Sequence, residues 1–513
     1  MRQFAIAALS VLSLSAQDPA RDSARVWNLY QKQEAPKLLP WLSEVIRFPT
    51  VAGNAQAWTD QKAWLQARAQ ELGFAFKDAG PIFEIELPGP EGAPVLGLVV
   101  HGDVQPVDAS HWSFPPFAGT VKDGSVIGRG AADDKGPLVQ ALLAMKALKE
   151  SGLARTQTIR LLVGSDEESG SSDITAYLKE HKAPDYSLVL DSGFPVVVGE
   201  KAWNALWVQA APDERAGRME PYSVESLDAG LSPSIVPDQA KLGLRWKEGA
   251  ADWTPLMKRL AAKRLPPGTH LLMKADGATL AITATGKSAH GGVNLEGGRN
   301  ALVALAMAMK DELPSGGADD LLAFARQAGG DLYGDGLGLT EKDPLWGRAA
   351  VNVAMAGPSA QVVKMGAPLA GTWALLINIR TPPPLFGKAL EQRLNDQVAA
   401  FGTRTGAKLA PGGFFLDTPL AFDPHSKLVK RLMADYTKAT GEHPAPAISG
   451  GGTYAKRLPN SIAFGMWFPG KPYPGHDVDE KMPVADLERG ERVLIETLVD
   501  LACHAPIQEP FKP

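Results

Sequence analysis

Continuous apolar runs that stop at charged or imidazole side chains mark the first two fifths of the chain. Residues 95–100 end at His101, residues 158–163 end just before an acidic loop, and residues 187–190 end at Asp191. Apolar runs of this length are typical of strands buried on both faces of a parallel sheet. We therefore expect several polar side chains to gather at one edge of a sheet.

A helix is predicted between the first two of these strands. Pro137 opens a segment whose apolar positions share one helical face, and Gly152 follows its end. Proline at the first helical position and glycine just past the last one are typical of a helix. The order strand, helix, strand, strand predicts an α/β fold with a doubly wound, mainly parallel sheet, in which ligands bind beyond the carboxyl ends of the strands.

The middle of the chain has a different pattern, without a cluster of metal-binding residues. Strand-like alternation and one alanine-rich helix occur there, at residues 241–246, 280–285, 372–380 and 300–310. Sheet-and-helix patterning then returns, with a helix predicted at 424–440 and an extended segment at 461–464.

These changes predict a catalytic domain that is interrupted by an inserted α+β domain. We place the first part of the catalytic domain at residues 17–204, the insert at 205–415 and the second part at 416–513. A chain of 513 residues, 45% hydrophobic and 21% charged, is long enough for two cores. A net charge of −5 and the lack of a basic stripe make nucleic acid an unexpected partner.

The first residues have the layout of a secretory signal peptide. Arg2 precedes an apolar run at 4–14, and Ser15 and Ala16 precede polar residues, so cleavage is expected after Ala16 despite Leu14. The run is too short to span a bilayer. A disordered or amphipathic N-terminus is the alternative. The signal-peptide layout leads us to expect an exported, periplasmic protein. Because the single cysteine, Cys503, allows no intrachain disulfide, its stability in an oxidising compartment would depend on core burial alone.

His101-Gly-Asp103 places a carboxylate two residues beyond an imidazole. Asp103 can accept a hydrogen bond from the second ring nitrogen and thereby orient a ligating His101. A pair of this kind alone is more often a turn or a surface contact. Its position at a predicted strand end favours a metal ligand.

The loop Gly128-Arg-Gly-Ala-Ala-Asp133-Asp134 is tight and acidic. It fails both phosphate-binding patterns, because Asp133 occupies a position that requires a small residue and no Gly-Lys-Ser/Thr follows. One alternative is that Asp133 or Asp134 only caps the following helix.

Asp166-Glu167-Glu168 brings carboxylates together at a strand end. Their repulsion is costly unless a cation offsets it, although a solvated acidic loop is the usual explanation. One glutamate could bind metal while its neighbour remains free as a base, as metal-assisted hydrolysis requires. His476, in Pro-Gly-His-Asp-Val-Asp-Glu, is ambiguous by itself, and only the full set is specific.

The full set, in this order, resembles the co-catalytic zinc peptidases of the aminoacylase and carboxypeptidase G family. It is most similar to the dipeptidase V and carnosinase branch. The motifs that carry the resemblance are HGDVQPVD (101–108), GRGAADDKGP (128–137), DEESGS (166–171), LVLDSGFP (188–195), SAHGG (288–292), Asn378-Ile-Arg380 and GGGTYAKRLPNSIAFG (450–465).

The resemblance implies two divalent ions, zinc with manganese or cobalt as alternatives. It assigns His101 and Asp191 to one ion, Glu168 and His476 to the other, and Asp133 as the bridge. It makes Glu167 the general base and Asp133–Asp134 a cis peptide bond.

The resemblance also gives the insert a role as a lid. His290 would donate to the developing oxyanion and Arg380 would bind a substrate carboxylate, while Gly451, Gly452 and Thr453 would contact the same end of the substrate. A buried structural histidine, an ordinary strand-edge arginine and a plain loop are the respective alternatives.

The implied activity is hydrolysis of dipeptides or short peptides that have a free carboxylate. The enlarged insert implies that His290 acts within its own chain, so a monomer is expected, with a homodimer as the alternative. Neither a membrane nor a nucleic acid is an expected partner. Deacylation of N-acyl amino acids in the same fold, or a binding protein that has lost catalysis, are the competing functions.

Overall fold

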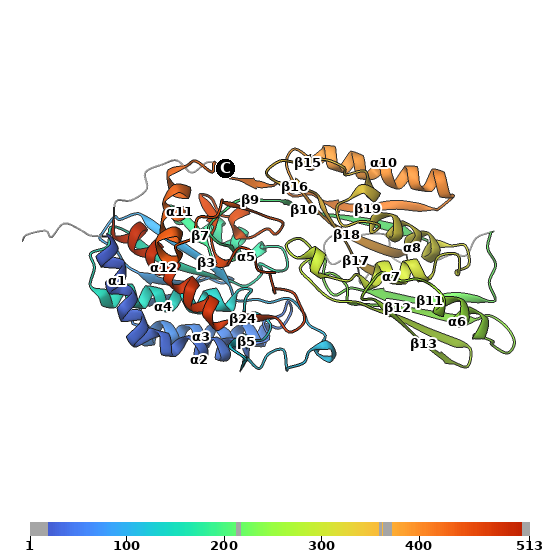
Figure 1. Cartoon of the computed structure of the whole chain (residues 1–513), viewed down its shortest axis with the longest axis horizontal. Coiled ribbons are helices and arrows are strands. Elements are labelled where there is room, and N and C mark those ends of the chain that lie inside the picture. The colour runs from blue at the N-terminus through green and yellow to red at the C-terminus, as the bar shows by residue number, and fades with distance from the viewer. Residues whose placement is uncertain (1–18, 212–216, 359–361, 363–371, 505–513) are drawn as a thin grey trace, which may run out of the picture.

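The computed structural model describes residues 19–211, 217–358, 362 and 372–504. Two domains lie side by side (Figure 1), one built from both ends of the chain and one from its middle. The expected signal peptide, residues 1–16, lies outside the described residues. Within the described ranges, no helix has both the length and the apolar character that a membrane span requires.

The main domain is built on a mixed sheet whose centre is parallel. In spatial order its strands are β1 (Ala75–Asp78), β2 (Phe83–Leu87), β6 (Thr158–Gly164), β3 (Val95–His101), β7 (Tyr186–Val189), β22 (Ser461–Ala463), β9 (Val197–Glu200) and β20 (Leu420–Ala421), with β21 (Ala447–Ser449) beside β9. β3 runs parallel to β6 and β7, and β22 runs parallel to β7. The strands expected from the apolar runs are present, with ends within one or two residues of those predicted.

Helices pack on both faces of this sheet. One face is covered by α1 (Pro19–Leu29), α2 (Ala35–Ile46), α3 (Ala55–Leu72), α4 (Lys135–Ser151), α11 (Lys427–Thr440) and α12 (Val484–Cys503). The other face carries α5 (Ser172–Glu180). As expected, Gly152 follows the last residue of α4, and its φ of 67° lies in the left-handed region that favours glycine.

The predicted order strand, helix, strand, strand was wrong in one place. α5 connects β6 to β7, so a helix separates these two strands as well. It has only nine residues, and its buried side chains are Asp173, Ile174 and Tyr177. Because these buried positions span only about one helical turn, they do not repeat often enough for a helical period to be recognised in the sequence.

The inserted domain is built on an antiparallel sheet. Its spatial order is β13 (His270–Asp276), β14 (Thr279–Thr285), β12 (Gln239–Trp246), β11 (Tyr222–Ala229), β17 (Ala350–Pro358), β18 (Trp373–Thr381), β10 (Ala202–Ala210) and β19 (Leu409–Phe415). One face packs against α6 (Thr254–Ala261), α7 (Ala301–Ala308), α8 (Gly317–Ala328) and α10 (Gly387–Thr405). The chain enters this domain from β9 into β10 and leaves it from β19 into β20. The α/β fold with an inserted α+β domain is therefore confirmed.

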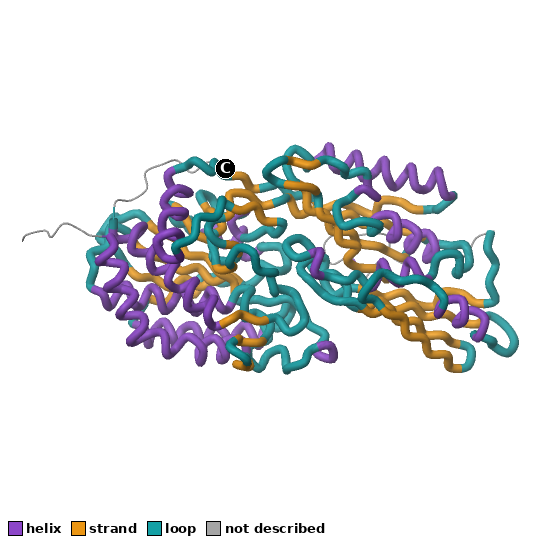
Figure 2. The backbone as a smooth tube through the Cα atoms, in the orientation of Figure 1, coloured by secondary structure: helices purple, strands orange, loops and turns teal. Residues whose placement is uncertain are grey.

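Short elements complete the two domains. They are β4 (Thr120–Lys122), β5 (Ser125–Ile127), β8 (Ser192–Gly193), β15 (Lys342–Asp343), β16 (Gly347–Arg348), β23 (Met466–Trp467), β24 (Lys481–Pro483), the π-helix η1 (Tyr30–Glu34), and the 3₁₀ turns η2 (Ala109–His111), η3 (Leu295–Gly297), η4 (Asp335–Leu337) and η5 (Tyr454–Lys456). Figure 2 shows that loops are concentrated where the two domains meet.

Candidate metal centre and active site

The predicted metal ligands meet at the carboxyl edge of the parallel strands. His101 is the last residue of β3, Glu167 and Glu168 follow β6, and Asp191 lies two residues beyond β7. Parallel strands end at the same edge of a sheet, which is why residues far apart in the chain come together here. Asp133 reaches the same place from the turn before α4.

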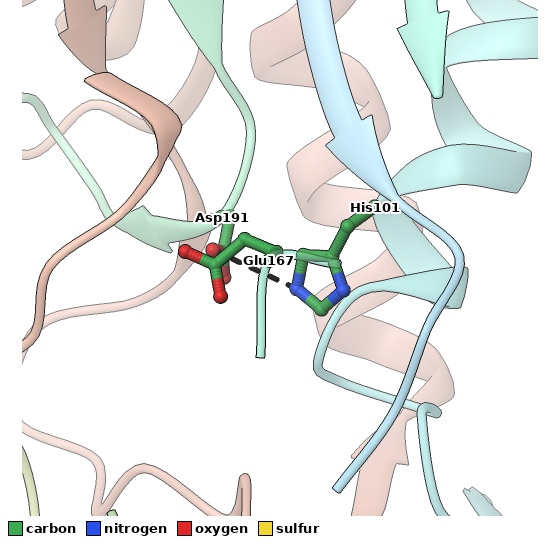
Figure 3. A group of neighbouring side chains, drawn as sticks. All are labelled: His101, Glu167 and Asp191. Atoms are coloured by element: carbon green, nitrogen blue, oxygen red, sulfur yellow. Dashed lines mark ion pairs between the residues drawn. The ribbon is translucent and has the colours of Figure 1, made fainter. Parts of the chain in front are cut away.

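The side chains form two groups that could each hold a metal ion. His101, Glu167 and Asp191 make one group, which Figure 3 shows converging. Asp133, Glu168 and His476 make the other. Within each group the candidate ligand atoms lie within 4.8 Å of one another. Both groups combine imidazole nitrogen with carboxylate oxygen, the donors that zinc and similar divalent ions accept.

The Asp133 carboxylate lies between the two groups. Its Oδ1 is 2.9 Å from His101 Nε2, and its Oδ2 is 3.1 Å from His476 Nε2. His476 Nε2 is also 3.1 Å from Glu168, and His101 Nε2 is 3.7 Å from Asp191. One oxygen of Asp133 therefore faces each group, as a bridging ligand requires.

Burial and crowding of like charges perturb the titration of this cluster. Burial, together with the negative charges of Asp191 and Glu168, raises the pKa of Glu167 well above its usual range. Burial alone would lower the pKa of His101, but the Asp103 and Asp133 carboxylates hold it well above its usual value. A divalent cation would offset the repulsion among these carboxylates, so the donor set fits metal binding.

Asp103 contacts the His101 ring mainly through its main chain, whereas the sequence suggested a contact through its carboxylate. The main-chain oxygen of Asp103, 2.9 Å from His101 Nδ1, is the nearer acceptor for the ring, whereas its carboxylate oxygen is 3.5 Å away. The carboxylate accepts from the backbone N–H groups of Glu167 at 3.2 Å and Glu168 at 3.1 Å. Asp103 therefore orients both the imidazole and the acidic loop.

Buried hydrogen bonds hold the loop that carries Asp133 in place. Asp134 does not cap α4; its carboxylate accepts from the His101 backbone N–H at 3.1 Å. The Asp133–Asp134 peptide bond is cis, as the resemblance implied. Fully buried Glu480 accepts from Arg129 at 2.7 Å and from the Asp133 backbone N–H at 3.2 Å. No local sequence pattern identified Glu480, because these partners lie 351 and 347 residues away along the chain.

The inserted domain contributes His290, whose ring is held in one tautomer. The backbone N–H groups of Gly292 and Val293 donate to His290 Nδ1 at 3.0 and 2.8 Å. Burial and the nearby positive charges of His476 and Arg380 lower the pKa of His290 well below its usual value. The neutral ring therefore carries its proton on Nε2 and is a hydrogen-bond donor. The ring also stacks on His476, with centroids 4.5 Å apart.

Arg380 on β18 is a buried cation, only 2% exposed. Its Nε donates to Asn378 at 2.9 Å, and a terminal nitrogen donates to the Ser234 hydroxyl at 3.2 Å. Burial lowers the pKa of Arg380 to about 10, so the group stays protonated at neutral pH. Among the described residues no carboxylate forms an ion pair with it, which leaves its charge available to a ligand.

The loop of Gly451, Gly452 and Thr453 borders the same cavity. The Thr453 hydroxyl and backbone N–H both donate to Glu200, so neither is free to donate to a ligand. The preceding residue, Gly450, lies against Gly292 of the inserted domain. A Cβ on either glycine would collide with the carbonyl oxygen of the other, which explains the need for glycine at this crossing.

A cavity of about 590 Å³ connects these features. The main domain contributes residues of both candidate metal groups to the lining of this cavity. The inserted domain contributes His290 and Arg380. Sequence reasoning did not identify two other residues at this site, Tyr473 and Ser234. Their surroundings depend on how the two domains meet, which local sequence does not show.

Imidazole–carboxylate groups at the strand ends of an α/β sheet, facing a cavity between domains, define a metal-dependent hydrolase. Residues 97–500 match the model of peptidase family M20/M25/M40, and the chain belongs to this family. Its metal dependence agrees with the two ligand groups described above.

Relatives with assigned names are similar over most of the chain. A putative dipeptidase, YtjP, from Bacillus subtilis (strain 168) is 27% identical over 417 residues, covering 80% of this chain and 84% of the relative. A putative dipeptidase from Staphylococcus epidermidis is 27% identical over 413 residues, again covering 80% and 84%.

Solved structures show the same fold at lower identity. The di-peptidase Dug1p from Saccharomyces cerevisiae has a TM-score of 0.59 and 15% identity, and covers 93% of this chain and 98% of its own. Human carnosine dipeptidase 1 has a TM-score of 0.57 and 13% identity, with 92% and 97% covered.

Proposed function

We propose that this peptidase is a dipeptidase that hydrolyses dipeptides and short peptides with a free C-terminal carboxylate. The observation that carries the proposal is the position of Arg380. It places a buried positive charge, without an ion-pair partner among the described residues, in the same cavity as the two ligand groups. The names of the similar proteins, putative dipeptidase among them, support this substrate class.

Two divalent ions would be held by the ligand groups, zinc with manganese or cobalt as alternatives. His101 and Asp191 would hold one and Glu168 and His476 the other, with Asp133 shared between them. The short contacts from Asp133 to both imidazoles support this division. Bound there, the ions would polarise the scissile carbonyl and lower the pKa of a water molecule.

Glu167 would act as the general base. It borders the cavity and belongs to the same candidate ligand group as His101 and Asp191, but the division proposed above assigns it to neither ion. Its carboxylate would take a proton from the attacking water and deliver it to the departing amine. Asp103 would keep Glu167 in place through the backbone contact described above.

Residues on both domains would hold the substrate. His290 Nε2–H would donate to the oxygen that becomes negatively charged in the transition state. Arg380 would bind the terminal carboxylate through a charge-assisted contact. Gly451, Gly452 and Thr453 would shape the wall beside it rather than add donors from the Thr453 hydroxyl.

The organisation of the chain would follow from this chemistry. Residues 205–415 would form a lid that opens for substrate, between catalytic segments 17–204 and 416–513. Because His290 already meets His476 within one chain, a monomer would suffice. Residues 1–16 would direct export to the periplasm.

The test combines metal removal with a substrate panel. Protein stripped with a chelator should lose dipeptide hydrolysis and regain it with zinc, manganese or cobalt, and metal analysis should find two ions per chain. Faster cleavage of N-acyl amino acids than of dipeptides would favour a deacylase instead. Unchanged hydrolysis after complete removal of metal would refute the mechanism.

A further inference from the structure

The cavity has an apolar wall on the inner face of the inserted sheet. Side chains alternate between the two faces of a strand. On the four neighbouring strands β10, β17, β18 and β19 (Figure 1), the residues that face the cavity are Trp203, Trp207, Met355, Leu376 and Phe415. Their neighbours on the opposite face, such as Leu375, pack beneath the helices instead.

This wall begins at the carboxylate anchor. Trp203 is the cross-strand partner of Arg380, and the guanidinium carbon lies 5.7 Å from its ring centroid. The Phe415 ring packs edge-on against Trp203 at 5.3 Å. Ala205 and Asn378 form the next pair on this face, and Trp207 and Leu376, which border the cavity, form the pair after it. Because a strand rises about 3.3 Å per residue, this pair lies roughly 13 Å farther along the sheet than Arg380.

The wall offers a ligand carbon surface and almost no free polar group. The indole N–H of Trp203 already donates to the Ser234 hydroxyl at 3.1 Å, and that of Trp207 donates to the Val362 main-chain oxygen at 3.2 Å. None of the five wall residues carries a charge. Trp207 and Leu376 are almost fully buried.

We propose that this wall is the subsite for the side chain of the carboxyl-terminal residue, so that the preferred substrates are dipeptides ending in a large apolar residue such as Phe or Leu. The inference rests on the proposed function, because it takes Arg380 as the carboxylate anchor. Carboxylate and side chain leave the same Cα atom. A carboxylate bound at Arg380 therefore places that side chain beside Trp203 and Phe415.

The expected preference among carboxyl-terminal side chains follows from the apolar area of each side chain that the wall can bury. Placing a Phe or Leu side chain against it, where Gly has none, should raise kcat/KM by about 10- to 100-fold. A terminal Asp should be as poor as Gly or worse, because the five wall residues provide no cation for a second carboxylate. Lys456, which also borders the cavity, is already paired with Asp417 at 2.7 Å.

The experiment compares Ala-Phe, Ala-Leu, Ala-Gly and Ala-Asp as substrates of the metal-loaded enzyme and two variants. Phe415→Ala removes the ring that packs on Trp203 beside the anchor, and Phe414→Ala removes its neighbour on the opposite face of the same strand. Both phenylalanines are partly buried, so both substitutions should lower stability. Phe415→Ala should lower the Phe-to-Gly ratio of kcat/KM roughly 5- to 20-fold. Phe414→Ala should leave that ratio unchanged.

The possible results separate this inference from the proposed function. Equal kcat/KM across the wild-type panel, or equal loss of the ratio in both variants, would overturn the subsite. No hydrolysis of any dipeptide would instead overturn the proposed function. Calorimetric binding of Ala-Phe and of Ala-Gly would then still test the wall. Tighter binding of Ala-Phe by wild type and by Phe414→Ala, but not by Phe415→Ala, would support the subsite, and equal binding of the two dipeptides would overturn it.

Discussion

Replacement of His290 tests whether the inserted domain takes part in the chemical step. In His290→Asn, the amide oxygen can still accept from the Gly292 and Val293 backbone N–H groups that now hold Nδ1. The shorter side chain no longer places a donor at the Nε2 position. The loop should therefore keep its conformation while the proposed oxyanion donor is lost.

The size of the effect follows from the number of donors removed. Loss of one preorganised oxyanion donor typically costs 10²- to 10³-fold in kcat, or about 2.7–4 kcal/mol. KM should change by less than about threefold, because the proposed contact of Arg380 with the substrate carboxylate would form in the ground state and would be unaffected by the substitution.

Steady-state kinetics with Ala-Phe, measured from about pH 6.5 to 8.5, would supply both constants. Because burial and nearby cations keep the pKa of His290 well below its usual value, the wild-type ring stays neutral across this range, and the variant should keep the same shape of pH profile. Val293→Ala is the matched control, because it trims the same loop but preserves the backbone donor. A kcat within threefold of wild type for His290→Asn, or an equal fall for Val293→Ala, would refute the reasoning.

Three further predictions address the base, the anchor and the pH dependence of stability. Glu167→Gln should lower kcat by about 10²- to 10⁴-fold while metal analysis finds the ion content unchanged; loss of metal would make Glu167 a ligand instead. Arg380→Lys should lower kcat/KM roughly 10- to 100-fold for free dipeptides but little for amidated ones, since lysine lacks the planar fork; equal losses would remove the assigned role. Burial and the neighbouring Asp500 raise the pKa of Asp435 to about 9, so the unfolded chain releases this proton near pH 4 and the folded chain does not. The free energy of unfolding of the wild type should therefore fall by up to about 1.4 kcal/mol per pH unit between these two pKa values. The Tm of Asp435→Asn minus that of wild type should then rise from pH 5 to pH 8. A Tm difference that stays constant with pH would contradict the raised pKa of Asp435.

The sequence was most informative where a local pattern determines a position in space. Apolar runs ending at His101 and Asp191 predicted parallel strands, and parallel strands bring their ends to one edge, so the grouping of these residues could be anticipated. The glycine at 152 likewise predicted the end of α4, because its left-handed conformation depends only on the adjacent turn.

Features that depend on distant segments were less accessible. Glu480 holds the Asp133 loop from almost 350 residues away, and the apolar wall exists only because β10, β17, β18 and β19 are neighbours. The main-chain contact of Asp103 with His101 arises from the turn after β3, whereas sequence reasoning considered only side chains. α5 was missed because its buried face is too short to produce a period.

The position of β22 affects the order in which the protein can form. This strand lies between β7 and β9, yet it follows every strand of the inserted sheet in the chain. During synthesis the inserted sheet has all its strands by Phe415, while β7 keeps an open edge until Ser461 emerges. Open strand edges promote association between chains, and contacts between distant residues form slowly. A chain truncated before Ser461 would thus retain the inserted sheet but expose the centre of the main one.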